Sequence, residues 1–321
     1  MFWRRKMNRI DNVLENIDSI AITGHVHPDG DCIGSCLALY TYVSLNYPKL
    51  MTDVYLEEPS QKYSFVKNFD RINSKYDKNI SYDLLVCLDC ASLERIGEAK
   101  KYFDSARLTI NIDHHVSNTK FADENYVFPN SSSACEALYG FLDPEKINWD
   151  MACALYTGII NDTGVFKYSC TSPETMCLAA ALMKYNIPTE HIIDESFFAK
   201  SYDENRILGY ALVRSVRCFN DQVIYSYISA DKMKEYNVTG RDMEGIVAQL
   251  RLTRGVRVAA FIYETGKDEY RLSLRSKDDY DVNNVAAVFG GGGHAKAAGA
   301  TLRGPIKECM AKLLTEIKKG L

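Results

Sequence analysis

Short runs of β-forming residues alternate with helical patterns through the first half of the chain. Strands are predicted at residues 20–23, 53–57, 84–88 and 108–112, and a helix over 33–46. Strands separated by helices favour a parallel sheet, because parallel neighbours need a long return connection. We therefore expect an α/β domain built on a mainly parallel, doubly wound sheet.

The second half changes character. Residues 132–217 look largely helical, and three more strands are predicted at 223–228, 256–264 and 270–275. Ser133 and Glu136 have the spacing of a helix capping box, so a helix start is favoured over a catalytic serine.

The 321 residues are enough for two domains, each with its own core. We expect a first domain over residues 1–190, a linker over 191–205 and a smaller α/β domain over 206–321. The active site is expected in the cleft between them.

Composition excludes some classes of protein. Hydrophobic residues make up 46% and charged residues 25% of the chain, which argues against disordered and membrane proteins. The basic start at residues 1–6 is followed by polar residues rather than a signal-peptide core, and no apolar run is long enough to cross a membrane. We expect a cytoplasmic protein that does not bind membranes.

Ten cysteines are present, and several lie in apolar segments, namely Cys36, Cys87, Cys153 and Cys177. This pattern favours small buried residues over a disulfide framework. Cys87 and Cys90 form a single C-x-x-C pair, which is weak evidence for zinc or redox chemistry. Ordinary strand cysteines are the favoured interpretation.

Charge is unevenly distributed. Residues 205–321 hold 19 Lys and Arg against 13 Asp and Glu, a balance of about +6. The whole chain has 38 basic and 42 acidic residues, which leaves 19 against 29, about −10, for the remainder. The acidic part could hold cations and the basic part a polyanion, although solvated surfaces would give the same counts.

Residues able to bind metal follow the predicted strands, at the edge where doubly wound folds place their sites. They are His25, Asp29 and Asp31 after the first strand, Asp89 after the third, Asp113, His114 and His115 after the fourth, and Asp162 after a later apolar helix. Turns, helix caps or structural histidines could explain each group alone. Four such groups at the ends of successive elements favour one shared site.

Mixed carboxylates and imidazoles suit Mn²⁺ or a similar cation better than structural zinc. Converging carboxylates would repel one another, and two divalent cations about 3.5 to 4 Å apart would relieve that repulsion. Such a pair can also hold the attacking and leaving oxygens of a phosphoryl displacement.

The sequence resembles the DHH phosphoesterase superfamily. The matching residues are the segment from His25 to Ser35, Asp89, the Asp113-His114-His115 triplet, and Asp162-Thr163-Gly164-x-Phe166. The segment from Gly290 to Gly299 resembles the signature of the DHH-associated C-terminal domain. The resemblance extends over nearly the whole chain.

The resemblance implies roles for these residues. One metal would be held by His25, Asp29 and Asp89, and the other by Asp31, Asp89, His114 and Asp162, with Asp89 bridging. Asp113 would orient the neighbouring imidazoles, and His115 would contact the scissile phosphate and help to protonate the leaving oxygen. His27 lies off the family pattern and is expected in a turn or outer position.

Further substrate-binding residues are expected in the second domain. The family's substrate-holding strand matches Ser273 and Arg275, which the strand period places on one face with Arg271. An arginine can grip phosphate through two parallel hydrogen bonds. The glycines Gly291, Gly292 and Gly293, followed by His294, would let backbone N–H groups approach an anion.

Within the superfamily the chain most resembles NrnA-like enzymes. This implies a manganese-dependent hydrolase that acts on short RNA oligonucleotides or removes phosphate from pAp. A phosphodiesterase for c-di-AMP or pApA is the alternative. A manganese pyrophosphatase and a noncatalytic RNA-binding module are less favoured, the second because the metal-ligand set is intact. The oligomeric state stays open, with a homodimer among the options.

Overall fold

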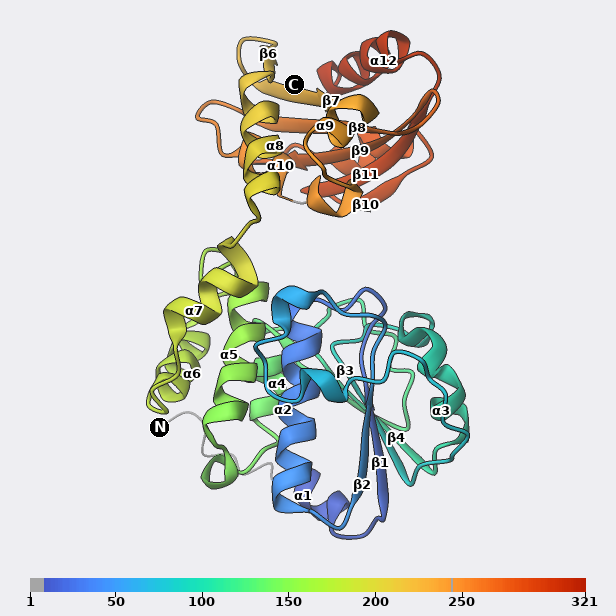
Figure 1. Cartoon of the computed structure of the whole chain (residues 1–321), viewed down its shortest axis with the longest axis vertical. Coiled ribbons are helices and arrows are strands. Elements are labelled where there is room, and N and C mark those ends of the chain that lie inside the picture. The colour runs from blue at the N-terminus through green and yellow to red at the C-terminus, as the bar shows by residue number, and fades with distance from the viewer. Residues whose placement is uncertain (1–8, 244) are drawn as a thin grey trace. The chain divides into compact units, whose positions relative to one another are not determined.

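The computed structural model describes residues 9–243 and 245–321, and Figure 1 shows their elements. The contacts between residues divide the chain into two compact units, Met1–Ala199 and Lys200–Leu321, and each is described by itself. Helical elements α7 (Thr189–Ile193), η5 (Asp194–Phe198) and α8 (Tyr202–Val213) occupy most of the range expected as a linker.

Unit 1 is built on a five-stranded parallel sheet in the order β2-β1-β3-β4-β5. The strands are β1 (Ser19–Thr23), β2 (Met51–Tyr55), β3 (Leu84–Leu88), β4 (Leu108–Asp113) and β5 (Glu124–Val127). This confirms the doubly wound α/β fold. Strand β5 was not predicted, because its short Glu-Asn-Tyr-Val run is polar and only half-buried.

Helices cover both faces of this sheet (Figure 1). They are α1 (Arg9–Leu14), α2 (Gly30–Asn46), α3 (Lys100–Ser105), α4 (Ala134–Tyr139), α5 (Trp149–Thr163), α6 (Pro173–Met183) and α7. Because neighbouring side chains of a strand point to opposite faces, Ile20 and Ile22 join the core beneath α2 and α5. Ala21 instead joins the smaller core that contains Tyr102 of α3.

Unit 2 contains a six-stranded mixed sheet in the order β10-β11-β9-β8-β7-β6, in which only β7 and β8 pair in parallel. Its strands are β6 (Val216–Cys218), β7 (Val223–Ile228), β8 (Val258–Gly266), β9 (Glu269–Ser276), β10 (Gly292–His294) and β11 (Ala297–Arg303). The smaller α/β domain is thus confirmed. Strands β6, β10 and β11 were not predicted, because they are short or rich in glycine and alanine.

The helices of unit 2 help to form separate cores on the two faces of this sheet. They are α8, α9 (Ala230–Glu235), α10 (Ile246–Arg251), α11 (Val282–Ala287) and α12 (Ile306–Lys318). Residues of α8 and α10 pack in one core, and residues of α11 and α12 in the other. Unit 2 therefore has its own hydrophobic interior.

The ten cysteines are all free, and most are buried, including Cys87 and Cys90. The expectation that Cys177 is buried was wrong, because this residue is exposed on α6. The buried stripe of that helix runs through Thr175, Leu178, Ala179 and Leu182, and position 177 lies off it. The basic segment at residues 1–6 lies outside the described residues. Among those described, no helix is both long and apolar enough for a membrane span.

Glycines set the close approach of α2 and α5. A Cβ on Gly34 would lie 2.5 Å from the carbonyl oxygen of Ala154 on α5. A Cβ on Gly158 would overlap the sulfur of Cys135 and lie 2.5 Å from Asp31 Oδ1. The two helices can therefore pack with their backbones close together only while both positions lack a side chain.

We predict that Gly158→Ala destabilises unit 1 by about 1–3 kcal/mol, because the added methyl overpacks a filled interior. Urea unfolding followed by circular dichroism measures this loss. Gly209→Ala is the matched control, since Gly209 lies in α8 and a Cβ there meets nothing within 4 Å. That variant should be as stable as the wild type or more so. Equal stability of the two variants would contradict the packing argument.

Candidate metal centre

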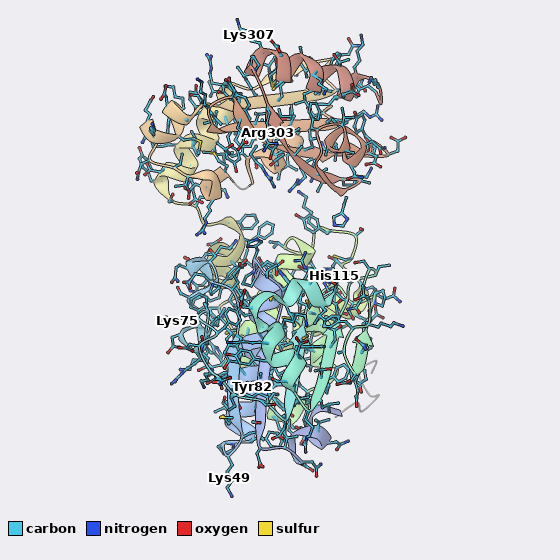
Figure 2. All side chains as sticks on the ribbon, turned by 90° about the vertical axis from the view of Figure 1, so that its right-hand side faces the viewer. Lys49, Lys75, Tyr82, His115, Arg303 and Lys307 are labelled. Carbon is cyan, nitrogen blue, oxygen red and sulfur yellow. The ribbon has the colours of Figure 1, made fainter. Side chains whose placement is uncertain are left out.

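The candidate site lies at the carboxyl ends of the strands of unit 1. His25 follows β1, Asp89 follows β3, and His114 and His115 follow β4. In a sheet of order 2-1-3-4-5 the crossovers change direction between β1 and β3, and ligands bind at that point. His115 lies at the opposite end of unit 1 from Lys49, which precedes β2 (Figure 2).

Asp89 is the centre of the arrangement. It is only 2% exposed and adopts a left-handed backbone conformation, with φ of 55°. Its Oδ2 lies 3.3 Å from His25 Nε2, and its Oδ1 lies 3.4 Å from His114 Nε2. Asp89 Oδ1 and His114 Nε2 are both buried without a hydrogen-bond partner among the described residues. Buried polar atoms left in this way fit a site for a cation.

Three groups of side chains at this edge could each hold a metal ion. The first is His25, Asp29 and Asp89, the second is Asp31, His114 and Asp162, and the third is Asp89, Asp113, His114 and His115; within each, one ligand atom per residue lies within 4.8 Å of the others. Oxygen and imidazole nitrogen donors suit a divalent first-row cation. The structure thus brings all six expected ligands to one edge of the sheet.

Helix termini hold two of these carboxylates. Asp31 is fully buried, and its oxygens accept from the backbone N–H groups of Ala134 and Cys135 at 2.5 and 2.9 Å. Asp29 caps α2 by accepting from the backbone N–H groups of Asp31 and Cys32. For Asp31 these donors stabilise a negative charge that burial would otherwise make costly, whereas the Asp29 side chain is 52% exposed.

The pKa values show how strongly the charges interact. Burial, and then the charge of Asp89, raise the pKa of Asp31 well above its usual range. Burial also raises the pKa of Asp162 to about 6, against the opposing effect of the His114 imidazole, whose Nε2 lies 3.1 Å from Asp162 Oδ2. These carboxylates therefore need positive charge nearby.

The imidazoles can supply that charge as protons. Burial lowers the pKa of His25, but the nearby carboxylates of Asp29 and Asp89 raise it overall to about 12. The pKa of His114 is raised to about 12 in the same way, by Asp162 and Asp89. A metal ion would replace these protons, because a ligating imidazole must be neutral.

His115 and Asp113, which belong to the third group, form a hydrogen-bonded pair. His115 Nδ1 lies 2.8 Å from Asp113 Oδ1, and Asp113 is fully buried. The hydrogen bond to Asp113 raises the pKa of His115, against the effect of burial. The His115 side chain is 42% exposed, so this imidazole can reach a bound molecule.

His27 points elsewhere. Its side chain is 90% exposed, and its Nδ1 lies 2.9 Å from Glu57 Oε2. It belongs to none of the three metal-binding groups. Glu57 was not expected here, because the strand predicted at 53–57 included it, whereas β2 ends at Tyr55.

In unit 2 the register of the sheet aligns the expected substrate-binding residues. Gly299 of β11 pairs with Ser273 on one side and Gly292 on the other, and Ala297 pairs with Arg275 and His294. Ser273 and Arg275 are half-buried, while Leu272 and Leu274 face the core. The strand period therefore gave the faces of β9 correctly.

The glycine run has a structural reason as well. A Cβ on Gly291 would overlap the carbonyl oxygen of Gly299, and Gly293 has φ of 152° with Ala297 behind it. Gly292 has more room, since its nearest neighbour, Asn283 Oδ1, would lie 3.7 Å from a Cβ. The approach of β10 to β11 thus requires at least two of these glycines.

Two family models match the chain. The N-terminal domain of the DHH family matches residues 19–159, and the DHHA1 domain matches residues 220–321. The bifunctional oligoribonuclease and PAP phosphatase NrnA of Thermus thermophilus is 29% identical, over 100% of this chain and 95% of that protein. The NrnA of Bacillus subtilis is 28% identical, over 89% of this chain and 90% of that protein.

Solved structures show the same fold. An exopolyphosphatase-related protein of Bacteroides fragilis superposes with a TM-score of 0.88 at 25% identity, over 98% of this chain and 95% of that one. RecJ of Thermus thermophilus, solved with Mn²⁺, has a TM-score of 0.55 at 10% identity and shares the fold over 55% of its length. The chain therefore carries the N-terminal domain of the DHH family in its first unit and the DHHA1 domain in its second.

Proposed function

We propose that this protein is a manganese-dependent, two-metal phosphoesterase that hydrolyses short oligoribonucleotides to mononucleotides and removes phosphate from pAp. The observation that carries the proposal is Asp89, whose two oxygens face two separate groups of ligands. A carboxylate in that position can bridge two cations. Paired cations are suited to phosphoryl displacement.

The ligand sets proposed for the two ions are His25, Asp29 and Asp89 for one and Asp31, Asp89, His114 and Asp162 for the other. The ions would lower the pKa of a bound water and offset the charge of the phosphoryl group. Asp31 is kept in place by the N-terminus of α4, and Asp162 by the last turn of α5.

His115 contacts the scissile phosphate in this proposal. Because Asp113 accepts from Nδ1, the proton-donating position toward the substrate is Nε2. From there the imidazolium can hydrogen-bond the phosphoryl group and give its proton to the leaving oxygen. Asp113 keeps the ring oriented and stabilises its charge.

The second domain holds the part of the substrate away from the bond that breaks. Residues 1–190 would form the metal-binding catalytic domain and 206–321 the substrate-binding domain. In the latter, Ser273, Arg275, Gly291, Gly292, Gly293 and His294 would bind the far phosphate. The names of the relatives, oligoribonuclease and PAP phosphatase, support nucleotides as substrates. A cytoplasmic location and a homodimer stay predictions.

The nearest alternative is a phosphodiesterase for c-di-AMP or pApA, which the same residues could serve. Parallel turnover assays with Mn²⁺ on pAp, pApA, c-di-AMP, a short RNA ladder and pyrophosphate would separate these activities. Release of mononucleotide from the RNA ladder and phosphate from pAp would support the proposal. Binding without turnover of any of these substrates would sink it.

We predict that chelation abolishes turnover and that Mn²⁺ restores it best, because carboxylates and imidazoles are mixed in one site. Asp89→Ala should reduce turnover more than any other single change, by more than about 100-fold. Replacing residues that only hydrogen-bond to metal ligands already lowers metal affinity or activity by about 10- to 100-fold. Steady-state kinetics and the ratio of bound metal to protein measure both effects. Asp104→Ala, at an exposed carboxylate paired with Lys100, is the control. Near wild-type turnover of Asp89→Ala would show that Asp89 does not bridge.

We predict that hydrolysis rates fall as the RNA grows beyond about five nucleotides, because the substrate-binding domain grips the far end of the substrate. Proteins with larger grooves bind single strands through sites of about four nucleotides or more, so about five is a reasonable upper limit here. An RNA ladder of increasing length, assayed at equal molar concentration, measures this. Equal rates on long RNA would indicate an open channel instead.

We predict a division of labour between the domains. His115→Ala should lower kcat by about 10²- to 10⁴-fold, as removal of a general acid does. Arg275→Ala and His294→Ala should instead raise KM for dinucleotides, because they grip ground and transition states alike. Arg271→Ala, on the same face of β9, is the matched control and should change neither constant.

A very small phosphate ester provides the contrasting substrate, since it cannot extend to the far-phosphate residues. The Arg275→Ala and His294→Ala variants should both hydrolyse this ester at almost the wild-type rate. If His294→Ala abolished that hydrolysis with fold and bound metal intact, His294 would belong to the chemical step.

A further inference from the structure

Asn118 closes the turn that follows His115. Its backbone N–H donates to the carbonyl oxygen of His115 at 3.1 Å. Val116 and Ser117 between them are exposed, whereas Asn118 is half-buried. The chain therefore turns back so that the Asn118 side chain lies under the loop that carries the two histidines.

The orientation of the Asn118 carboxamide is fixed. Its Oδ1 accepts from the backbone N–H of Lys120 at 2.7 Å, so the nitrogen must face the other way. There Nδ2 lies 2.6 Å from Asp113 Oδ2, 2.8 Å from Asn111 Oδ1 and 3.0 Å from the carbonyl oxygen of Cys90. A flipped amide would set oxygen against the Asp113 carboxylate.

Asp113 is thereby held at both oxygens. Oδ2 accepts from Asn118, and Oδ1 lies 2.8 Å from His115 Nδ1. Because Asp113 is fully buried, no solvent can replace a lost donor without cost. Removing the Asn118 amide would free the carboxylate to rotate, and His115 would lose its fixed partner.

Asn118 also touches the loop that follows Asp89. The carbonyl oxygen of Cys90 lies near its Nδ2, and the backbone N–H of Thr119 donates to the carbonyl oxygen of Ala91 at 2.9 Å. An effect of Asn118 on activity could thus pass through His115 or through the metal ligand Asp89, and the two routes predict different measurements.

We propose that Asn118 is a positioning residue that acts through Asp113 to hold the imidazole of His115 in its working orientation. The inference rests on the proposed function for its kinetic consequence. The geometric part stands on the hydrogen bonds alone.

The kinetic experiment compares four variants in the Mn²⁺-loaded full chain on a dinucleotide: Asn118→Ala, His115→Ala, their double variant, and Asn125→Ala. Asn125 is the matched control because its side chain also closes a local loop, at Ala122, without touching the site. Asn118→Ala should lower kcat about 10- to 100-fold with KM and bound metal unchanged. The double variant should be no slower than His115→Ala beyond about twofold, since residues acting as one unit are not additive.

A second measurement does not depend on turnover. In ¹⁵N-labelled protein, the Nδ1–H signal of His115 should show the downfield proton of a hydrogen bond to carboxylate. That signal should be lost or shifted upfield in Asn118→Ala and kept in Asn125→Ala.

The outcomes separate the hypotheses. Three outcomes would overturn the proposal that Asn118 acts through His115. The first is a wild-type kcat in Asn118→Ala, and the second is a loss of bound metal in that variant. The third is an Asn118→Ala loss of kcat that is equally large with His115 present and with His115 replaced by alanine. If the wild type hydrolysed no nucleotide at all, the proposed function would fail, and the His115 signal would still decide whether Asn118 positions the ring. An unchanged signal would overturn the positioning role.

Discussion

Repulsion among carboxylates gathered at one edge of the sheet is the constraint on which the site depends. Asp31 and Asp89 are buried, and Asp162 lies beside them. Placing such charges away from water costs several kcal/mol each unless nearby groups compensate. Part of the compensation comes from the N-terminus of α4, and part from the two imidazoles that face Asp89. Asp89 Oδ1 is still buried without a hydrogen-bond partner among the described residues, so a cation there would complete the compensation.

Helix packing makes this gathering feasible. Asp31 begins α2 and Asp162 ends α5, so their separation is set by how closely the two helices pack. Gly34 and Gly158 allow that close contact, and Gly158 lies directly against the Asp31 carboxylate. The same interior thus supports the fold and fixes the spacing of the ligands, which is why a change far from solvent can alter the chemistry.

Hydrogen bonds outside the candidate metal ligands hold the residues next to them. Asn111 and Asp113, both buried in β4, form a polar network with the half-buried Asn118 and the loop that follows β3. Each member has a defined donor or acceptor role, so the network orients His115 without binding a metal. In unit 2 the register of the strands positions the expected substrate-binding residues. Small residues of β11 pair with Ser273 and Arg275 on one side and with β10 on the other.

The sequence by itself determined the fold class, because buried strands separated by helical patterns leave few alternatives to a parallel sheet. It also indicated the cluster of candidate ligands, since carboxyl ends of parallel strands meet at one edge. It could not give β5, β10 or β11, whose residues lack a strong apolar pattern. Nor could it show the donors to Asp31 from Ala134 and Cys135, or the role of Asn118. Those contacts join segments brought together only by packing, and no periodicity along the chain encodes them.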